Sequence, residues 1–216
     1  MLEIHDLDVS IGPVGILRQI ALKLAPQEMA GLIGRNGAGK TTLMRSIMGL
    51  LPARRGQILF DGKPLTTAPA WTRARLGIGY MPEDRRLVPE LSVQENICVP
   101  SWAMKRTDTQ ERWEEVCRMI PEVREFAPRK AQQLSGGQQK LVAIGRALMC
   151  GSRLLLLDEP FEGVAPALAR RIAEVIANLK SGGLSIIIAE SDLRHSAELL
   201  DTVFNIERGA ISNGRP

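Results

Sequence analysis

The chain has 216 residues, of which 44% are hydrophobic and 24% are charged, and its formal net charge at pH 7 is +4. These values are close to those of globular proteins, and they disfavour a disordered, collagen-like or coiled-coil chain. The mild positive charge is compatible with a patch for nucleic acid or an anionic membrane. The sequence has no long block of like charge, however, and favours an ordinary solvated surface.

Short strand-like segments alternate with helical segments along the chain, which favours an α/β fold. In the first part of the chain, the composition of residues 41–51 predicts a helix, and this helix follows a buried strand that ends in glycine. Strands are predicted over residues 2–9, 16–24, 29–34, 57–62 and 77–82.

The middle of the chain, residues 92–150, lacks convincing strands. Its apolar residues Trp113, Val116, Cys117 and Ile120 recur at the spacing of one helix face, and we expect them to pack in the core. Residues 137–149 have the pattern of a second helix. This part of the chain is therefore predicted to form a helical subdomain.

The last third returns to alternating strands and helices. Residues 153–160 form the most apolar predicted strand, and Pro166 suits the first turn of the helix that follows. One face of that helix carries Leu168, Ile172, Val175, Ile176 and Leu179. Residues 184–191 predict a further buried strand, and residues 202–211 predict a strand, a turn at Arg208 and Gly209, and a short return strand.

The three cysteines are widely spaced, and we interpret them as reduced thiols of a cytosolic protein. With two histidines in the whole chain, the composition argues against a structural zinc site. The first residues include acids where a signal peptide would be basic and then apolar. Because the longest apolar stretches are too short to span a bilayer, we expect a chain that does not cross a membrane by itself.

The segment GRNGAGKTT matches the pattern G-x-x-x-x-G-K-[ST] at Gly34, Gly39, Lys40 and Thr41. It follows a predicted strand and opens a predicted helix, which is the context of a phosphate-binding P-loop. Glycines let backbone N–H groups turn inward around phosphate oxygens, and the helix N-terminus adds partial positive charge. We expect Lys40 to reach the β- and γ-phosphates and the Thr41 hydroxyl to bind Mg²⁺.

The segment LLLLDEP supplies the second half of a nucleotide site. Its apolar run delivers Asp158 to the C-terminal end of a strand, where ligands bind in α/β folds. We expect Asp158 to hold Mg²⁺ through water, and Glu159 to polarise an attacking water molecule. The plainer alternative is an acidic pair that caps a strand.

The segment LSGGQQK, at residues 134–140, is a third signal. Ser135 can cap a helix while Gly136 and Gly137 expose backbone N–H groups at its start, which makes a second anion site. One nucleotide does not need two phosphate cradles in one fold. The arrangement makes sense if two chains face each other and each offers its cradle to the other's ATP. An ordinary glycine-rich helix start is the alternative.

These three motifs, in this order and separation, resemble the ATP-binding subunit of an ABC transporter, and the resemblance covers nearly the whole chain. It implies an ABC-type P-loop ATPase with a core mixed sheet flanked by helices, an N-terminal antiparallel β part and an inserted helical subdomain. In this single domain, residues 1–83 and 151–216 would form the nucleotide-binding core, and residues 84–150 the helical signature subdomain. It further implies a head-to-tail dimer with two ATP molecules, bound with Mg²⁺, at the interface.

The resemblance assigns site residues one by one. Those for the nucleotide are Gly34, Arg35, Asn36, Gly37, Ala38, Gly39, Lys40, Thr41, Thr42 and Ile11, together with Ser135, Gly136, Gly137 and Gln138 toward the partner's ATP. Those for catalysis are Glu159, Lys40, Glu83 and Ser191, and those for Mg²⁺ are Thr41, Asp158 and Glu83.

Finer features resemble one branch of the family, the importers of branched-chain amino acids, urea or short amides. Glu83, in the segment YMPEDRR, stands where most of the superfamily has a glutamine that senses the γ-phosphate, and this branch often has Pro-Glu there. The resemblance implies permease subunits, a second ATP-binding subunit (identical or different), and indirectly a periplasmic solute-binding protein. It implies no nucleic acid, and a location on the cytoplasmic face of the bacterial inner membrane.

The sequence departs from the superfamily at three positions. Ile11 stands where an aromatic residue stacks on adenine, so stacking of about 1 kcal/mol is lost. Ala165 stands where the loop after Glu159 usually carries aspartate. Ser191 stands where a histidine normally contacts the γ-phosphate, while His195, one helical turn further on, is expected to face outward.

These departures favour an alternative in which the subunit is a nucleotide-dependent clamp with weak hydrolysis, paired with a more active ATPase. Glu159 opposes that alternative. An ATPase of DNA repair or chromosome structure would need long coiled-coil insertions, and the sequence has no sustained heptads. A GTPase would need an Asn-Lys-x-Asp segment, which is absent from the sequence.

Overall fold

The computed structural model describes residues 1–214, and its strands form two sheets. The first sheet is antiparallel and has the order β2-β1-β4-β5. Its strands are β1 (Leu2–Ile11), β2 (Val14–Leu24), β4 (Arg55–Phe60) and β5 (Lys63–Pro64). Buried and exposed residues alternate along much of β1 and β2 because one face of this sheet meets the core and the other meets solvent.

The second sheet has the order β10-β9-β3-β8-β7-β6 and is parallel from β9 to β6, with β10 antiparallel at its edge. Its strands are β3 (Met29–Ile33), β6 (Ile78–Met81), β7 (Leu154–Asp158), β8 (Ser185–Glu190), β9 (Thr202–Glu207) and β10 (Ala210–Gly214). Every residue of β7 and β8 is buried, as expected for central strands covered on both faces.

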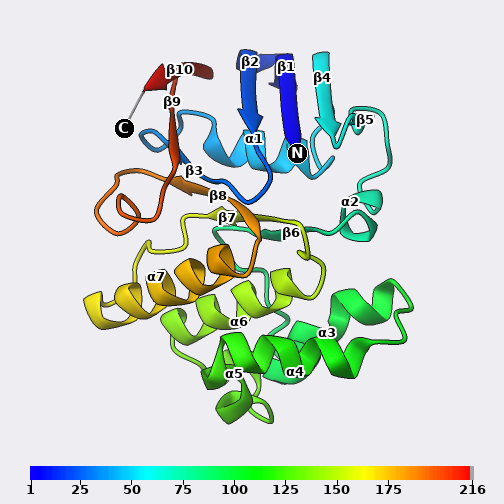
Figure 1. The fold of residues 1–216 in the computed structure, drawn as a ribbon, viewed down its shortest axis with the longest axis vertical. Coiled ribbons are helices and arrows are strands. Elements are labelled where there is room, and N and C mark those ends of the chain that lie inside the picture. Colours follow the sequence, from blue (N-terminus) through cyan, green and yellow to red (C-terminus); the bar gives the residue numbers. More distant parts are fainter. Residues whose placement is uncertain (215–216) are drawn as a thin grey trace.

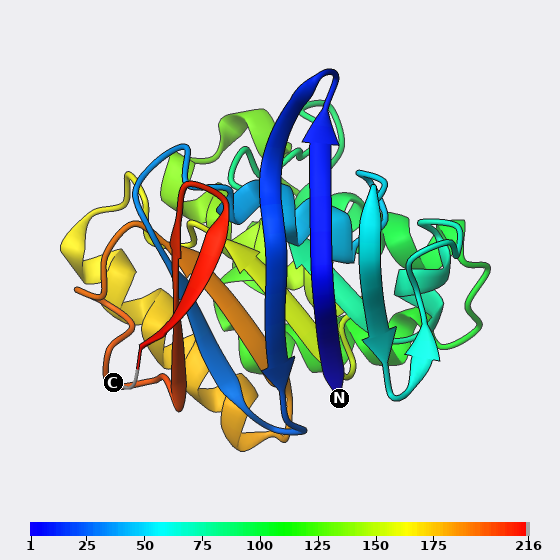
Figure 2. The ribbon, with the colours of Figure 1, turned by 90° about the horizontal axis from the view of Figure 1, so that it is seen from above.

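Helix α1 (Lys40–Ile47) lies between the two sheets, as Figures 1 and 2 show. It contributes Leu43, Met44 and Ile47 to a core that also takes apolar residues from the antiparallel sheet and from one face of the six-stranded sheet. The helix ends earlier than the predicted residue 51 because the chain turns at Gly49, whose φ of +70° is left-handed and favours glycine.

The remaining longer helices cover the other face of the six-stranded sheet (Figure 1). They are α3 (Val93–Ala103), α4 (Thr109–Met119), α5 (Pro121–Phe126), α6 (Gly136–Leu148) and α7 (Pro166–Ser181), with a short 3-10 turn at Ala131–Gln133. The apolar face predicted from Trp113 to Ile120 is buried here. The chain also forms α2 (Thr72–Arg75), which, like β5, the sequence pattern did not predict.

The predicted α/β class is confirmed, with a mixed core sheet, an antiparallel N-terminal part and a helical insert. Of the helices formed by residues 1–214, none has both the length and the apolar character needed to span a bilayer.

Candidate functional site

Four neighbouring parallel strands end at the same edge of the sheet, and each end carries a predicted site residue. The P-loop follows β3, Ser191 follows β8, Asp158 and Glu159 stand at the end of β7, and Glu83 follows β6. Because β3, β8, β7 and β6 are adjacent in that order, segments far apart in sequence converge there.

The P-loop is shaped by two glycines. A Cβ on Gly34 would lie 2.2 Å from the carbonyl oxygen of Ile206, so any side chain there would collide with β9. Gly39 has a φ of +114°, which is strained for other residues. Gly39 also precedes α1, and no described side chain caps that helix, so its first amides are left for an anion.

Lys40 is buried at the start of α1, with 6% of its surface exposed. Its ammonium donates to the carbonyl oxygens of Gly34 at 2.5 Å and Arg35 at 3.3 Å. The same group lies 3.1 Å from Glu159 Oε1. Lys40 therefore joins the P-loop to the carboxylate predicted to activate water.

Asp158 is fully buried and accepts hydrogen bonds from Thr41 Oγ1 at 3.2 Å and from the Tyr80 hydroxyl at 3.1 Å. Burial raises the pKa of Asp158 to about 6, although both hydrogen bonds act in the opposite direction. Burial raises the pKa of Tyr80, and the neighbouring Asp158 carboxylate raises it further, so the Tyr80 hydroxyl stays protonated. Tyr80 was not predicted as a site residue.

A magnesium ion fits this arrangement because it would neutralise a carboxylate that is costly to keep charged and buried. Among residues 1–214, no group of three or more histidine, cysteine, aspartate or glutamate side chains is arranged to hold a metal. Magnesium does not need such a group, since it commonly binds one or two protein oxygens together with phosphates and water. Thr41 and Asp158 offer those protein oxygens, and the exposed Glu83 lines one cavity together with Thr41.

Glu159 is 8% exposed and has a left-handed backbone, with a φ of +50°. Its N–H donates to the carbonyl oxygen of Ala189 at 2.9 Å, and its own carbonyl oxygen accepts from Lys140 Nζ at 2.6 Å. The backbone is thus held on both sides, while the carboxylate faces Lys40 and Ser191.

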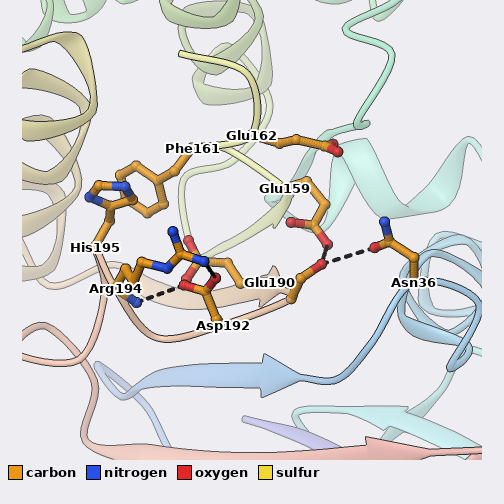
Figure 3. A pocket seen from close by; sticks show the side chains of 9 residues that line it. Asn36, Glu159, Phe161, Glu162, Glu190, Asp192, Arg194 and His195 are labelled. Atoms are coloured by element: carbon orange, nitrogen blue, oxygen red, sulfur yellow. Dashed lines mark hydrogen bonds and ion pairs between the residues drawn. The ribbon is translucent and has the colours of Figure 1, made fainter. Parts of the chain in front are cut away.

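Ser191 connects the P-loop to Glu159. Its hydroxyl lies 2.9 Å from Asn36 Oδ1 and 3.0 Å from Glu159 Oε1, and its one proton can be donated to either oxygen (Figure 3). His195 is exposed, on a segment of turns rather than a helix, and its ring packs 5.4 Å from the Phe161 ring between centroids. The expected outward position of His195 is confirmed, although residues 191–199 form bends and turns and not a helix.

Glu190 was also missed by the sequence analysis. It is 4% exposed, and Oε2 accepts a 2.5 Å hydrogen bond from the Ser196 hydroxyl. Its other carboxylate oxygen has no hydrogen-bond partner among the described residues. Burial raises the pKa of Glu190 to about 7.

Two cavities flank Glu159. One, of about 410 Å³, is lined by P-loop residues, Ile16, Glu83 and Glu159. The other, of about 310 Å³, is lined by Glu190, Phe161 and His195 among others (Figure 3). Ile11, predicted to meet adenine, is 48% exposed at the end of β1. Among the described residues of the β1–β2 hairpin, it is Ile16 that lines the P-loop cavity.

The second predicted cradle lies at the start of α6. Ser135 Oγ accepts from the Gln138 amide at 3.3 Å, and Gln138 Oε1 accepts from the Ser135 amide at 3.0 Å, which forms a capping box. Ser135 and Gly136 are exposed, and the residues described as lining the P-loop cavity include none from this turn. Gly137 instead packs inward, since a Cβ there would lie 1.9 Å from Leu168.

A family model described as ABC transporter matches residues 17–162. The chain is 34% identical over 211 residues to a high-affinity branched-chain amino acid transport ATP-binding protein, BraG, of Pseudomonas aeruginosa, covering 98% of this chain and 91% of the relative. It is 30% identical to a probable LivF of Archaeoglobus fulgidus, with 98% and 90% covered. It is also 32% identical to the lipopolysaccharide export protein LptB of Haemophilus influenzae, with 93% and 85% covered.

Solved structures of ATP-binding cassettes superpose on this chain. A nucleotide-free ATP-binding cassette from an ABC transporter superposes with a TM-score of 0.89 at 28% identity, covering 100% of this chain and 91% of that one. The ADP conformation of another such cassette gives a TM-score of 0.86 at 26% identity, with the same coverage.

Proposed function

Because this chain belongs to the ABC transporter family, as an ATP-binding subunit that couples ATP hydrolysis to transport, we propose that it powers an importer. The solutes would be branched-chain amino acids, urea or short amides. The observation that carries the catalytic part is that Lys40, Thr41 and Glu159 line one cavity, with Asp158 hydrogen-bonded to Thr41 behind it. The names of the BraG and LivF relatives support the solute class.

The proposed reaction follows from the contacts of Glu159. Phosphate oxygens entering the P-loop compete for the Lys40 ammonium, which frees the Glu159 carboxylate to accept a hydrogen bond from water. Glu159 would then orient that water toward the γ-phosphate and accept its proton. Bound Mg²⁺, held by Thr41 and Asp158, would supply charge neutralisation for the phosphates.

We propose that two ATP-binding subunits complete each other's sites. Ser135, Gly136 and Gln138 sit at an exposed helix start away from the chain's own P-loop cavity, so they can meet the nucleotide of a facing chain. The proposed division assigns residues 1–83 and 151–216 to the core and residues 84–150 to the signature subdomain. The permease would dock on that subdomain and on the loop around Glu83, at the cytoplasmic face of a bacterial inner membrane, with a periplasmic binding protein delivering solute.

A clamp with weak hydrolysis is the second candidate, and Ser191 favours it because a serine cannot carry positive charge toward the γ-phosphate. The test is steady-state phosphate release from MgATP. Wild type should hydrolyse, and Glu159→Gln should keep ATP binding but lose roughly 10²–10⁴-fold in rate. Lys40→Ala should lose much of the thermal stabilisation by MgATP. An unchanged rate for Glu159→Gln would remove Glu159 from the mechanism.

The solute class needs a separate experiment because LptB relatives are exporters by name. A strain in which Glu159→Gln replaces the wild-type chain should lose uptake of labelled branched-chain amino acids, urea or short amides. Normal uptake of all of them, together with a defect in lipopolysaccharide delivery, would overturn the importer proposal and favour export.

A further inference from the structure

Helix α6 carries a lysine that the three sequence motifs leave unexplained. Lys140 lies just past the first turn of this helix, after Ser135 and Gly136, and is 5% exposed. A buried ammonium is costly, and burial lowers the pKa of Lys140. An apolar residue at this site would avoid that cost, so the contacts of the ammonium must account for it.

The ammonium of Lys140 donates a 2.6 Å hydrogen bond to the carbonyl oxygen of Glu159. Glu159 needs such a contact because its φ of +50° is unfavourable for a residue with a side chain. Its amide is already fixed to β8 through Ala189. The lysine fixes the other side of the same residue, and so determines where the Glu159 carboxylate lies between Lys40 and Ser191.

A second basic residue on the same helix holds the second catalytic loop in a similar way. Arg146 donates to the carbonyl oxygens of Arg85 and of Arg86, the latter at 2.6 Å. Both of these residues also have left-handed backbones, with φ values of 60° and 50°. Two loops that reach the nucleotide site, the one after Glu83 and the one at Glu159, are therefore anchored to one helix.

We propose that Lys140 is a positioning residue for Glu159, acting through the backbone carbonyl to hold the carboxylate where it can take a proton from water. This inference rests on the proposed function, because it requires Glu159 to act on water. Lys140 itself touches neither phosphate nor water in this scheme. Its loss should therefore slow the chemical step and leave nucleotide binding nearly intact.

The primary variant is Lys140→Met, which keeps the length and shape of the side chain and removes the donor. We expect kcat to fall roughly tenfold, since one charge-assisted hydrogen bond is lost and only part of its free energy affects the transition state. The KM for MgATP should stay within about twofold. Lys140→Gln, which keeps an uncharged donor, should recover part of the rate.

The matched control is Lys180→Met. Lys180 also donates to a backbone carbonyl, that of Leu199 at 3.0 Å, and to Asp201 Oδ1 at 2.6 Å. Asp201 in turn accepts from the Met29 amide at the first residue of β3, at the opposite end of that strand from the P-loop. Its kcat should equal that of wild type. A second readout uses single-turnover hydrolysis in the Glu159→Gln background, where Lys140→Met should cause no further loss because its target carboxylate is gone. If Lys140 had only a structural role, Lys140→Met would slow hydrolysis further in this background.

Three results would overturn the inference: an unchanged kcat in Lys140→Met, a rise in the KM for MgATP as large as the fall in kcat, or a further loss of rate in the Glu159→Gln background. Should Lys140→Met fail to fold, Lys140→Gln decides by the same three measurements. The proposed function fails differently: wild type would not hydrolyse MgATP, or Glu159→Gln would keep the wild-type rate.

Discussion

The molecule contains two glycine-rich helix starts that differ in how their amides are used. At α1, Gly39 is left-handed and no described side chain caps the helix. At α6, the Gln138 side chain accepts from the Ser135 amide, and the Ser135 hydroxyl accepts from the Gln138 amide. The first start is therefore built to bind an anion, while the second is stable without one.

Their surroundings differ as well. Around α1 stand buried charged groups, namely Lys40, Asp158 and Glu159, each held by further contacts. The α6 start is exposed, and Ser135, Gly136 and Gln138 are not among the residues described as lining the P-loop cavity. One start thus belongs to a site that a single chain nearly completes, and we propose that the other becomes a site only opposite a second chain. The difference suggests that monomer binding and dimer hydrolysis can be separated by mutation.

The largest effect should come from a charge placed at the exposed start. Gly136→Asp puts a carboxylate where the partner's γ-phosphate would lie, and the residue has room because its Cβ would meet Arg85 alone, at 3.1 Å, among the described residues. Hydrolysis that depends on the dimer should fall roughly 10²-fold or more, as when an oxyanion contact is lost. MgATP binding by the monomer, measured by thermal shift, should persist.

The control for this variant is Gly182→Asp, which adds the same charge at the C-terminal end of α7 and should leave hydrolysis unchanged. Gly137 is less suitable for the experiment because its substitution displaces Leu168 and tests packing at the same time. Loss of monomer binding in Gly136→Asp would mean that the two starts are not separable.

The same contrast explains what the sequence could predict. The glycines, Lys40 and Asp158 lie in short contiguous motifs, so their roles follow from local pattern and from the strand end that carries them. Tyr80 could not be placed, because its bond to Asp158 joins residues 78 positions apart. Lys140 and Glu190 look like ordinary helix and strand residues, and their importance comes from burial beside other elements.

A smaller effect should follow from changing Ser191, which sharpens the view of the α1 site as nearly complete. Ser191→His introduces a longer side chain that can donate to the γ-phosphate and carry positive charge. Basal kcat should rise several-fold, since part of one charge-assisted hydrogen bond is gained in the transition state. ATP affinity should change less than turnover, as measured by phosphate release at saturating MgATP.

Ser191→Ala provides the comparison, because it removes the contact with Glu159 Oε1 without adding a new one. Its kcat should change less than threefold, since the backbone of Glu159 stays fixed by its contacts with Ala189 and Lys140. A slower Ser191→His in a folded protein would show that the serine is not a missing catalytic group.

The smallest effect is on stability and concerns Glu190, behind the P-loop. Its folded pKa of about 7 lies above the ordinary value of 4.5, so the fold binds this proton more tightly than the unfolded chain does. That contribution to stability is complete below about pH 4.5 and is lost as the pH rises through about 7. Glu190→Gln resembles the protonated form and does not titrate. Its melting temperature should match wild type near pH 5 and exceed it by several degrees at pH 8.

The groups that act on Glu190 electrostatically are Glu159 and Asp192, which raise its pKa, and Lys140, which lowers it. All three remain in Glu190→Gln, as does Asp158, so their contributions are common to variant and wild type and largely cancel in the difference between the two. Gln138→Ala, at the exposed α6 start, serves as the contrasting control. It should lower stability by about 1 kcal/mol through the lost capping box, equally at pH 5 and pH 8, because no buried titratable group is involved. If the difference between Glu190→Gln and wild type is flat with pH, then the carboxyl group does not carry this proton. The surroundings of the α1 and α6 helix starts would then differ in their ligand contacts and not in their response to pH.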